Sequence, residues 1–259
     1  MIDINAYLGH FAFRQLRHNT APELLRLMDS RKIRQAAVSS ADAIAYRNVQ
    51  PANEQLAAEV EHHRDRLIPF AVINPTYAGW ADDLATCQEK LGMKGLRLYP
   101  RWHNYKLTDP ACLELVKAAT GRGMLITIPV RVEDPRQRTW LVEIPDVPLA
   151  EIEGLVRAAP SAQFAILNGL GYTGSALGRK GSGLPANYSI DVGRMSAVLA
   201  NELGRLVENL GADRILFGSG MPFQYPDPAI VKVEVLEVSA ADKEDILTRN
   251  AARLLRLQL

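Results

Sequence analysis

Short apolar runs alternate along the chain with longer segments in which apolar residues recur every three or four positions. The short runs predict eight strands, at Ile2–Asn5, Gln35–Ser39, Leu67–Ile73, Gly95–Leu98, Met124–Val130, Gln163–Leu167, Tyr188–Val192 and Arg214–Phe217. The longer segments predict helices at Pro22–Ser30, Asn53–Arg64, Trp80–Lys90, Pro110–Thr120, Leu149–Ala159, Ser196–Leu210 and, at the end, Ala240–Leu257. Because each strand is followed by a connection long enough for a helix, the strands are expected to pair in parallel.

Eight such strand–helix units in 259 residues are the usual content of one α/β barrel. The chain is 47% hydrophobic, enough for one large core, and no repeat or flexible linker divides it. We therefore predict a single (β/α)8 TIM-barrel domain over residues 1–259.

Charge and cysteine usage narrow the choice of partner and compartment. The 30 basic and 29 acidic residues create no strong field for nucleic acid or for an anionic membrane, so a small molecule is the expected partner. No apolar run approaches the length of a membrane span, and no secretory leader pattern precedes the first strand. Cys87 and Cys112 lie in helical patterns without metal-binding or redox spacing. These features favour a cytoplasmic protein with buried thiols.

In a TIM barrel the chemistry lies at the carboxyl ends of the strands, so candidate residues follow from the strand assignment. Arg97 ends the fourth strand, and its planar guanidinium suits a carboxylate or a phosphate. Arg14, Arg131 and Arg136 lie in loops at the same end of the barrel and add positive charge. An anionic substrate is therefore expected. The alternative is that Arg97 forms a structural ion pair with Glu133 or Asp191.

General acid–base chemistry points to three residues, His103, Glu133 and Asp191, because their groups titrate near neutral pH or can be tuned to do so. His103 lies in an aromatic loop that can exclude water, although a loop histidine more often makes an ordinary hydrogen bond. Asp191 ends the seventh strand and is expected to face the mouth of the barrel. Asp134 is expected only to cap the turn that follows it.

Amides and phenols complete the predicted substrate site. Asn5, Asn74 and Asn168 end the first, third and sixth strands, where amide groups can donate to a carbonyl or an oxyanion. The alternative is that they satisfy backbone groups where strands turn into loops. The phenols are those of Tyr7, Tyr99 and Tyr105, which can bind substrate or form the walls of the site.

The whole chain resembles the amidohydrolase-related (amidohydrolase 2) branch of the metal-dependent hydrolase superfamily. The resemblance is carried by the segments Ile2–Gly9, Gly92–Pro100, Asp213–Pro222 and Asn250–Leu255. It implies a TIM barrel whose metal is held by two His of the first strand, His residues ending the fifth and often the sixth strand, and an Asp ending the eighth.

This sequence departs from that pattern at every ligand position, where it carries Asn5, Tyr7, Pro129, Gly169 and Gly220. An amide oxygen or a phenol is a poor substitute for imidazole or carboxylate. The sequence therefore predicts no ordinary metal site and no cofactor.

This sequence also resembles a smaller group within the family, with which it shares further motifs. Its members share the Gly9-His10-x-x-x-Arg14 turn, Asn74-Pro75, and Glu133-Asp134-x-Arg136. The resemblance thus places the chain in a group depleted of metal ligands, for which the family name supplies the fold and not the activity.

Three functions are compatible with these residues. The favoured one is a metal-independent hydrolase or lyase that acts on a small carboxylated or phosphorylated compound. The alternatives are a ligand-binding barrel that has lost its chemistry, and a metal-dependent hydrolase with a displaced site built from His103, Glu133 and Asp191. Convergence of Arg97 and these three residues on one cavity would favour an enzyme. Homo-oligomers are common among such barrels, and the oligomeric state stays open.

Overall fold

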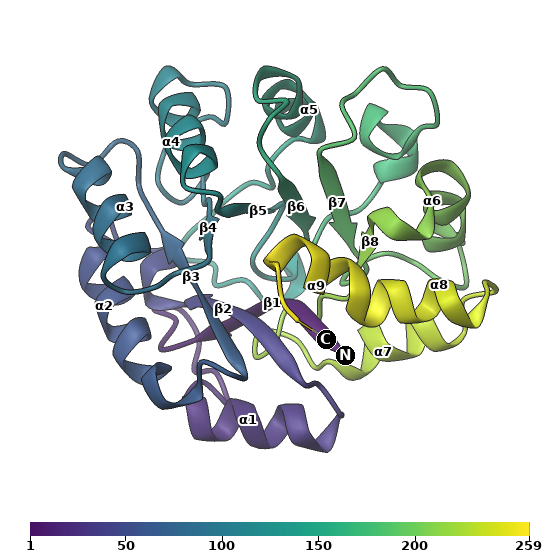
Figure 1. Ribbon diagram of the computed structural model, residues 1–259, viewed down its shortest axis with the longest axis horizontal. Coiled ribbons are helices and arrows are strands. Elements are labelled where there is room, and N and C mark those ends of the chain that lie inside the picture. The colour runs from purple at the N-terminus through teal and green to yellow at the C-terminus, as the bar shows by residue number, and fades with distance from the viewer. Residues whose placement is uncertain (259) are drawn as a thin grey trace.

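The computed structural model describes residues 1–258 and confirms the predicted (β/α)8 barrel (Figure 1). Its eight strands are parallel and pair in chain order from β1 to β8. The strands are β1 (Ile2–Leu8), β2 (Gln35–Ser40), β3 (Leu67–Val72), β4 (Gly95–Arg97), β5 (Leu125–Pro129), β6 (Phe164–Leu167), β7 (Tyr188–Asp191) and β8 (Ile215–Leu216). The circle closes where the Ile4 amide donates to the Phe217 carbonyl over 3.0 Å and the Tyr7 amide donates to the Met221 carbonyl over 2.9 Å.

Helices surround this barrel between the strands. They are α1 (Ala21–Ser30), α2 (Gln50–Glu59), α3 (Trp80–Glu89), α4 (Pro110–Gly121), α5 (Leu149–Ala158), α6 (Glu202–Leu210), α7 (Asp227–Glu234), α8 (Ala240–Glu244) and α9 (Asn250–Leu255). Three helix predictions were wrong in detail, and α7 was not predicted. Helix α2 spans Gln50–Glu59 and not Asn53–Arg64. Helix α6 begins at Glu202 and not at Ser196, because Asn201 has a left-handed backbone with φ of 44° that ends any regular helix. The predicted last helix is divided by a π-helical turn at Asp245–Arg249, which separates α8 from α9.

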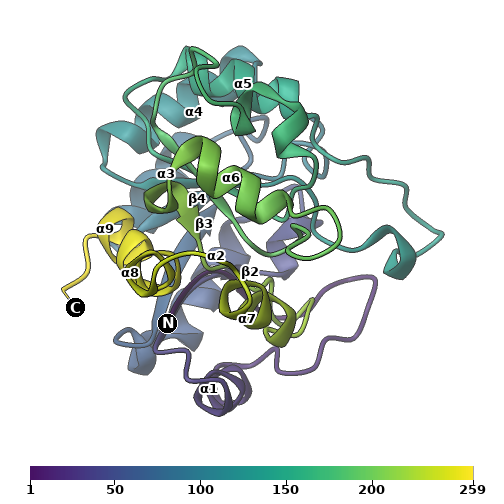
Figure 2. The same cartoon turned by 90° about the vertical axis from the view of Figure 1, so that its right-hand side faces the viewer.

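Helix α9 covers the amino-terminal end of the barrel. Its residues Ala251, Ala252 and Leu255 pack in one buried cluster with side chains from inside the barrel, among them Ile4 and Phe70. Figure 2 shows both termini on this side, whereas the long loops after β1 and β5 extend on the opposite side. Helix α9 therefore closes the barrel interior at this end, and the active sites of TIM barrels lie at the other, at the carboxyl ends of the strands.

Two further observations bear on the sequence-based expectations. Cys87 and Cys112 are buried free thiols, as predicted, and burial raises the pKa of each to about 12, which leaves them unreactive. Within residues 1–258, none of the helices is both long and apolar enough to cross a membrane.

Candidate functional site

Arg97 lies inside the barrel and is fully buried. Strand β1 has one extra residue relative to β2 between Asp3 and Ala6, and such a bulge leaves backbone groups without strand partners. Arg97 donates from Nη2 to the carbonyl of Ile4 over 3.2 Å and from Nη1 to that of Ala6 over 3.1 Å. Its guanidinium carbon also lies 4.7 Å from the centre of the Tyr7 ring. The ion pair with Glu133 or Asp191, which the sequence offered as the alternative to ligand binding, is absent among the described residues, and Arg97 instead holds the bulge.

Asp191 is the centre of a buried polar network. Its Oδ1 accepts from the amides of Asn168 over 2.9 Å and Gly193 over 3.3 Å, and its Oδ2 accepts from Asn5 Nδ2 over 3.1 Å. Burial raises the pKa of Asp191 to about 7, although these donors oppose the rise. Two amide atoms of the network, Asn5 Oδ1 and Asn168 Nδ2, are buried without a hydrogen-bond partner in residues 1–258. Asn5 and Asn168 therefore both contact Asp191, Asn5 through its side-chain amide and Asn168 through its backbone amide.

Asp3 is a second buried carboxylate next to this network. It accepts from the amide of Asn5 over 2.9 Å, and from the amide of Ser219 over 3.0 Å. The Ser219 hydroxyl also donates to Asp3 and accepts from the amide of Met221. These bonds join β1 to the segment after β8. Burial raises the pKa of Asp3 to about 6.

His103 is buried beside Tyr99 and Tyr105, with ring centroids 6.0 and 6.5 Å away. Its Nε2 lies 3.0 Å from the carbonyl of Ala43, which can only accept, so Nε2 carries the proton. Burial lowers the pKa of His103 to about 4, and the ring is neutral near pH 7. This is the ordinary hydrogen-bonding arrangement that the sequence offered as the alternative to catalysis.

Aromatic side chains cover the mouth above Arg97. Tyr7 and Phe11 each meet the ring of Phe223 edge-on, at centroid distances of 4.9 and 5.0 Å. Phe11 in turn contacts Phe13 and Trp102 at 5.6 and 5.8 Å. This cover separates Arg97 from solvent, so any ligand must bind above it and not inside the barrel.

A basic hollow of about 440 Å³, here called the wider hollow, opens beside the aromatic cover. Its charged side chains are Arg14, Arg17, Arg136 and Arg194 with a single carboxylate, Asp134. Hydrogen bonds from Arg136 and Arg194 hold the pKa of Asp134 well below its usual range. Asp134 also accepts from the amide of Arg136, as its predicted capping role requires. The excess of guanidinium groups fits an anionic ligand.

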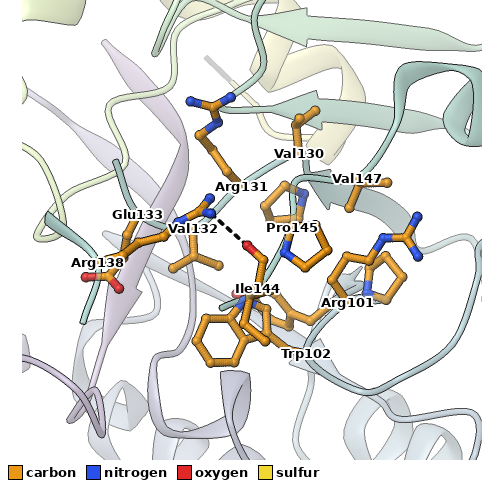
Figure 3. A pocket seen from close by; sticks show the side chains of 13 residues that line it. Arg101, Trp102, Val130, Arg131, Val132, Glu133, Arg138, Ile144, Pro145 and Val147 are labelled. Carbon is orange, nitrogen blue, oxygen red and sulfur yellow. Dashed lines mark hydrogen bonds between the residues drawn. The ribbon is translucent and has the colours of Figure 1, made fainter. Parts of the chain in front are cut away.

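A second, narrow hollow lies under residues 131–147, the β5–α5 loop (Figure 3). It is lined on one side by Trp102 and on the other by Ile144 and Pro145, with Arg131 and Arg138 at its edge. Its volume of about 20 Å³ holds roughly one water molecule. Arg138 donates to the carbonyl of Ile144 over 2.7 Å, which keeps the loop against this hollow.

The ion pair between Arg14 and Glu133 lies between the two hollows. Arg14 lines the wider hollow and Glu133 lines the narrow one, and Arg14 Nε is 3.3 Å from Glu133 Oε1. Glu133 is buried, and burial raises the pKa of its carboxyl group, while Arg14 opposes the rise. Glu133 is thus the one predicted acid–base residue that borders a hollow; His103 and Asp191 line neither of the two.

Other predicted residues have local roles. Asn74 accepts from the amide and hydroxyl of Thr76 and donates to the carbonyl of Arg47, which is the turn-satisfying alternative. Tyr99 lines the narrow hollow, whereas Tyr105 is buried in the main core.

Sequence reasoning missed four charged residues at the mouth. They are Arg17, Arg138, Asp146 and Arg194. Arg194 comes three residues after the end of β7, so a wider search around strand ends would have found it. Asp146 gives no such signal, because it lies 17 residues beyond the end of β5 and returns to the mouth only through the loop.

The parallel barrel and the position of both hollows define a TIM-barrel protein with its site at the carboxyl ends of the strands. The family model described as Amidohydrolase matches residues 4–147 and 197–257, and the chain belongs to this family.

Among solved structures, 2,6-dihydroxybenzoate decarboxylase complexed with 2,6-dihydroxybenzoate is 20% identical, with a TM-score of 0.75 over 99% of both chains. The 5-carboxyvanillate decarboxylase from Sphingomonas paucimobilis is 18% identical, with a TM-score of 0.71 over 91% of this chain and 83% of the other. A dihydroxybenzoic acid decarboxylase from Polaromonas sp. JS666, with bound manganese and 2-nitroresorcinol, is 18% identical, with a TM-score of 0.68 over 91% of this chain and 86% of the other. Likeness at these identities shows the fold alone. None of the curated proteins matches the chain.

The residues at the family's metal positions do not fit a metal ion. The Tyr7 ring packs on Phe223 and on the Arg97 guanidinium, so a fixed positive charge lies 4.7 Å from the ring that replaces the second His of the first strand. A side chain at Gly169 would collide with Tyr172, so no imidazole is accommodated there without rearrangement. No three His, Cys, Asp or Glu side chains in residues 1–258 are placed to share an ion. The displaced site expected from His103, Glu133 and Asp191 therefore does not form in this arrangement.

Proposed function

We propose that this protein is a metal-independent lyase or hydrolase of a small aromatic carboxylate, and that decarboxylation is its favoured reaction. The observation that carries the proposal is the wider hollow, which is lined by four arginine side chains and one carboxylate, and in which Arg14 also pairs with Glu133. Guanidinium groups bind carboxylates in a two-pronged geometry, and an excess of them attracts an anion. The names of the similar structures, which are decarboxylases of aromatic acids, support this choice of reaction.

The walls of the mouth support an aromatic substrate. Phe223 and the exposed Tyr225 line the wider hollow, and Trp102 lines the narrow one. Aromatic rings stack favourably on one another and exclude water from the groups between them. A ring with a carboxylate therefore matches the mouth better than an aliphatic phosphate does.

Glu133 is the proposed proton donor. In its acid form it gives its proton to the ring carbon that carries the carboxylate. The bond from that carbon to the carboxylate carbon then breaks, its electron pair returns to the ring, and CO2 leaves. Glu133 recovers a proton from water. Burial, which raises the pKa of this carboxyl, favours the acid form that the step needs.

The test is turnover of a panel of hydroxybenzoates by protein dialysed against EDTA, with CO2 release and loss of substrate as readouts. We expect at least one compound to be decarboxylated, and Glu133→Gln to reduce its kcat by about 100-fold or more, the usual effect of a lost general acid. Glu114→Gln, at an exposed position of α4, is the matched control and should retain the wild-type rate. Turnover that appears only after a divalent metal is added would contradict the proposal.

A ligand-binding barrel without chemistry is the second candidate. It is favoured by one observation: His103 and Asp191, two of the three expected acid–base residues, are buried away from both hollows. Binding of hydroxybenzoates without turnover of any compound in the panel would support this candidate instead.

A further inference from the structure

We infer that Arg131 and Arg138 form a carboxylate-binding subsite of the narrow hollow, and that Asp146 of the same chain occupies it in the described state. Asp146 is thus an internal competitor of the ligand. The inference rests on the proposed function for the nature of the ligand, a small aromatic carboxylate, but it concerns binding and not the chemical step.

The contacts of Asp146 resemble those of a bound carboxylate. Arg138 Nη2 donates to Asp146 Oδ1 over 2.7 Å, and Arg131 Nη2 donates to the other oxygen, Oδ2. Each oxygen therefore has its own guanidinium. The Arg131 and Arg138 side chains are only 15% and 23% exposed, whereas Asp146 is 31% exposed. Both arginines line the narrow hollow, whereas Asp146 is more exposed and is not part of its lining.

The narrow hollow has the walls of an aromatic site but no room for a ring. Trp102, Ile144 and Pro145 line it, and its volume of about 20 Å³ is far below the roughly 150 Å³ of a cavity that admits benzene. A ring can enter only if the β5–α5 loop moves outward. The loop therefore has to release some of the bonds that hold it.

Asp146 supplies the bonds that a ligand can replace. The loop is held at its end by the Val147 amide, which donates to the Val130 carbonyl over 2.9 Å, and this bond does not involve charge. The bonds of Asp146 are different, because an incoming carboxylate offers the same two oxygens to Arg131 and Arg138. When the ligand carboxylate replaces that of Asp146, the charge at both guanidinium groups stays balanced, so neither is left unpaired. The replacement also removes one restraint on the neighbouring residues Ile144 and Pro145, and the bond from Arg138 to the Ile144 carbonyl must break as well before they move away from Trp102.

A competitor within the chain lowers the apparent affinity for a ligand in proportion to the population of the closed form. We therefore expect Asp146→Asn to bind benzoate about tenfold more tightly than the wild type, because the amide cannot neutralise either arginine. Benzoate is the probe because it has the ring and the carboxylate and no hydroxyl group. Its Kd is measured by isothermal titration calorimetry at low ionic strength.

The matched control is Asp29→Asn. Asp29 also accepts from an arginine, Arg66, over 2.6 Å, but it lines neither hollow. We expect this variant to show no gain in affinity. In the Asp146→Asn background, Arg138→Met should abolish the gain, since it removes half of the subsite. Near-ultraviolet circular dichroism checks that each variant is folded.

An unchanged Kd in folded Asp146→Asn would overturn the inference, as would an equal gain in Asp29→Asn or a gain that survives Arg138→Met. The result is separable from the proposed function. Tighter benzoate binding without turnover of any hydroxybenzoate would uphold the subsite and reject the enzyme. Turnover of a hydroxybenzoate by the wild type, with no effect of Asp146→Asn on the benzoate Kd, would uphold the enzyme and reject the subsite.

Discussion

Arg97 is a fully buried cation that has no carboxylate within 4.0 Å in the described part of the chain. A buried charge of this kind is costly unless neutral acceptors and polarisable groups surround it. Arg97 has the carbonyls of Ile4 and Ala6, the Thr127 hydroxyl at 3.1 Å, and the Tyr7 ring. Its role is therefore to satisfy the β1 bulge, and loss of the side chain affects folding before it affects any ligand.

We predict that Arg97→Met lowers the free energy of unfolding by about 3 kcal/mol or more, because it leaves two buried carbonyls without donors. Urea denaturation followed by circular dichroism measures the effect. This differs from the expectation from sequence, in which Arg97 anchors a ligand and its removal spares the fold. Arg17→Met, at an exposed position, is the control and should change stability by less than about 0.5 kcal/mol. A variant at Arg97 as stable as the wild type would restore the anchor role.

The sequence identified most of the residue types at the mouth but not their directions. Glu133 and Arg14 were predicted from their position after strand ends, and they do border the hollows. Arg97 was predicted on the same ground and points inward, because a bulge in a different strand provides its acceptors. Such a contact depends on the register of β1 against β2, which a residue pattern does not reveal.

At the scale of elements, β4 is short and depends on close packing. It has only three residues, Gly95–Arg97, and a β-carbon added at Gly95 would collide with the Phe70 ring of β3. Gly95 is paired in register with Phe70 on one side and Leu125 on the other. Because Gly95 has no side chain, the Phe70 ring can fill the barrel interior beside β4, the strand that carries Arg97.

We predict that Gly95→Ala destabilises the protein by about 1 to 3 kcal/mol through overpacking against Phe70. Gly121→Ala is the matched control: it lies in the last turn of α4, and nothing is within 4 Å of its added β-carbon. The control should be neutral or slightly stabilising, since alanine favours a helix. Thermal melting of both variants checks the pair, and equal melting temperatures would rule out the packing argument.

Strands were easier to predict than the later helices. All eight strands agree with their apolar runs to within two or three residues at each end, because burial on both faces demands continuous apolar sequence. Helix α7 was missed, since it has only eight residues and follows directly on Pro226. The arrangement of the mouth could not be predicted from sequence, because its hollows depend on ion pairs such as Arg131 with Asp146, which the β5–α5 loop brings together.

For the whole molecule, the barrel interior contains two carboxyl groups that folding removes from water. Asp3 and Asp191 are both fully buried, and burial raises their pKa values to about 6 and about 7, from 3.8 in an ordinary environment. Between about pH 4 and 7 the folded chain therefore binds more protons at these groups than the unfolded chain. Their contribution to stability must fall as the pH rises through this window.

His103 acts in the opposite sense. Burial lowers its pKa to about 4, compared with about 6.5 in the unfolded chain. Between these two pH values the unfolded chain binds a proton that the folded chain does not. The contribution of His103 to stability is therefore lost as the pH falls. The pH profile of the wild type alone mixes both effects. A variant that removes only one titrating group separates them.

Asp191→Asn is the variant that isolates the carboxylate. The amide oxygen introduced at position 191 can accept from the backbone amides of Asn168 and Gly193. The Asn5 side chain can turn so that its Oδ1, which has no partner in the wild type, accepts from the amide nitrogen introduced at position 191. We predict that the free energy of unfolding of this variant rises relative to that of the wild type as the pH increases from 5 to 8. Urea denaturation at several pH values measures the difference.

Asp134→Asn is the control for this pH dependence, because the pKa of Asp134 is held below its usual range. The Asp134 carboxylate makes its full contribution to stability above about pH 4 and loses it only at lower pH. The difference in free energy of unfolding between Asp134→Asn and the wild type should therefore stay constant between pH 5 and 8. A constant difference for Asp191→Asn as well would mean that Asp191 is already ionised at pH 5. Its three hydrogen-bond donors would then outweigh burial, and the barrel centre would hold a carboxylate anion.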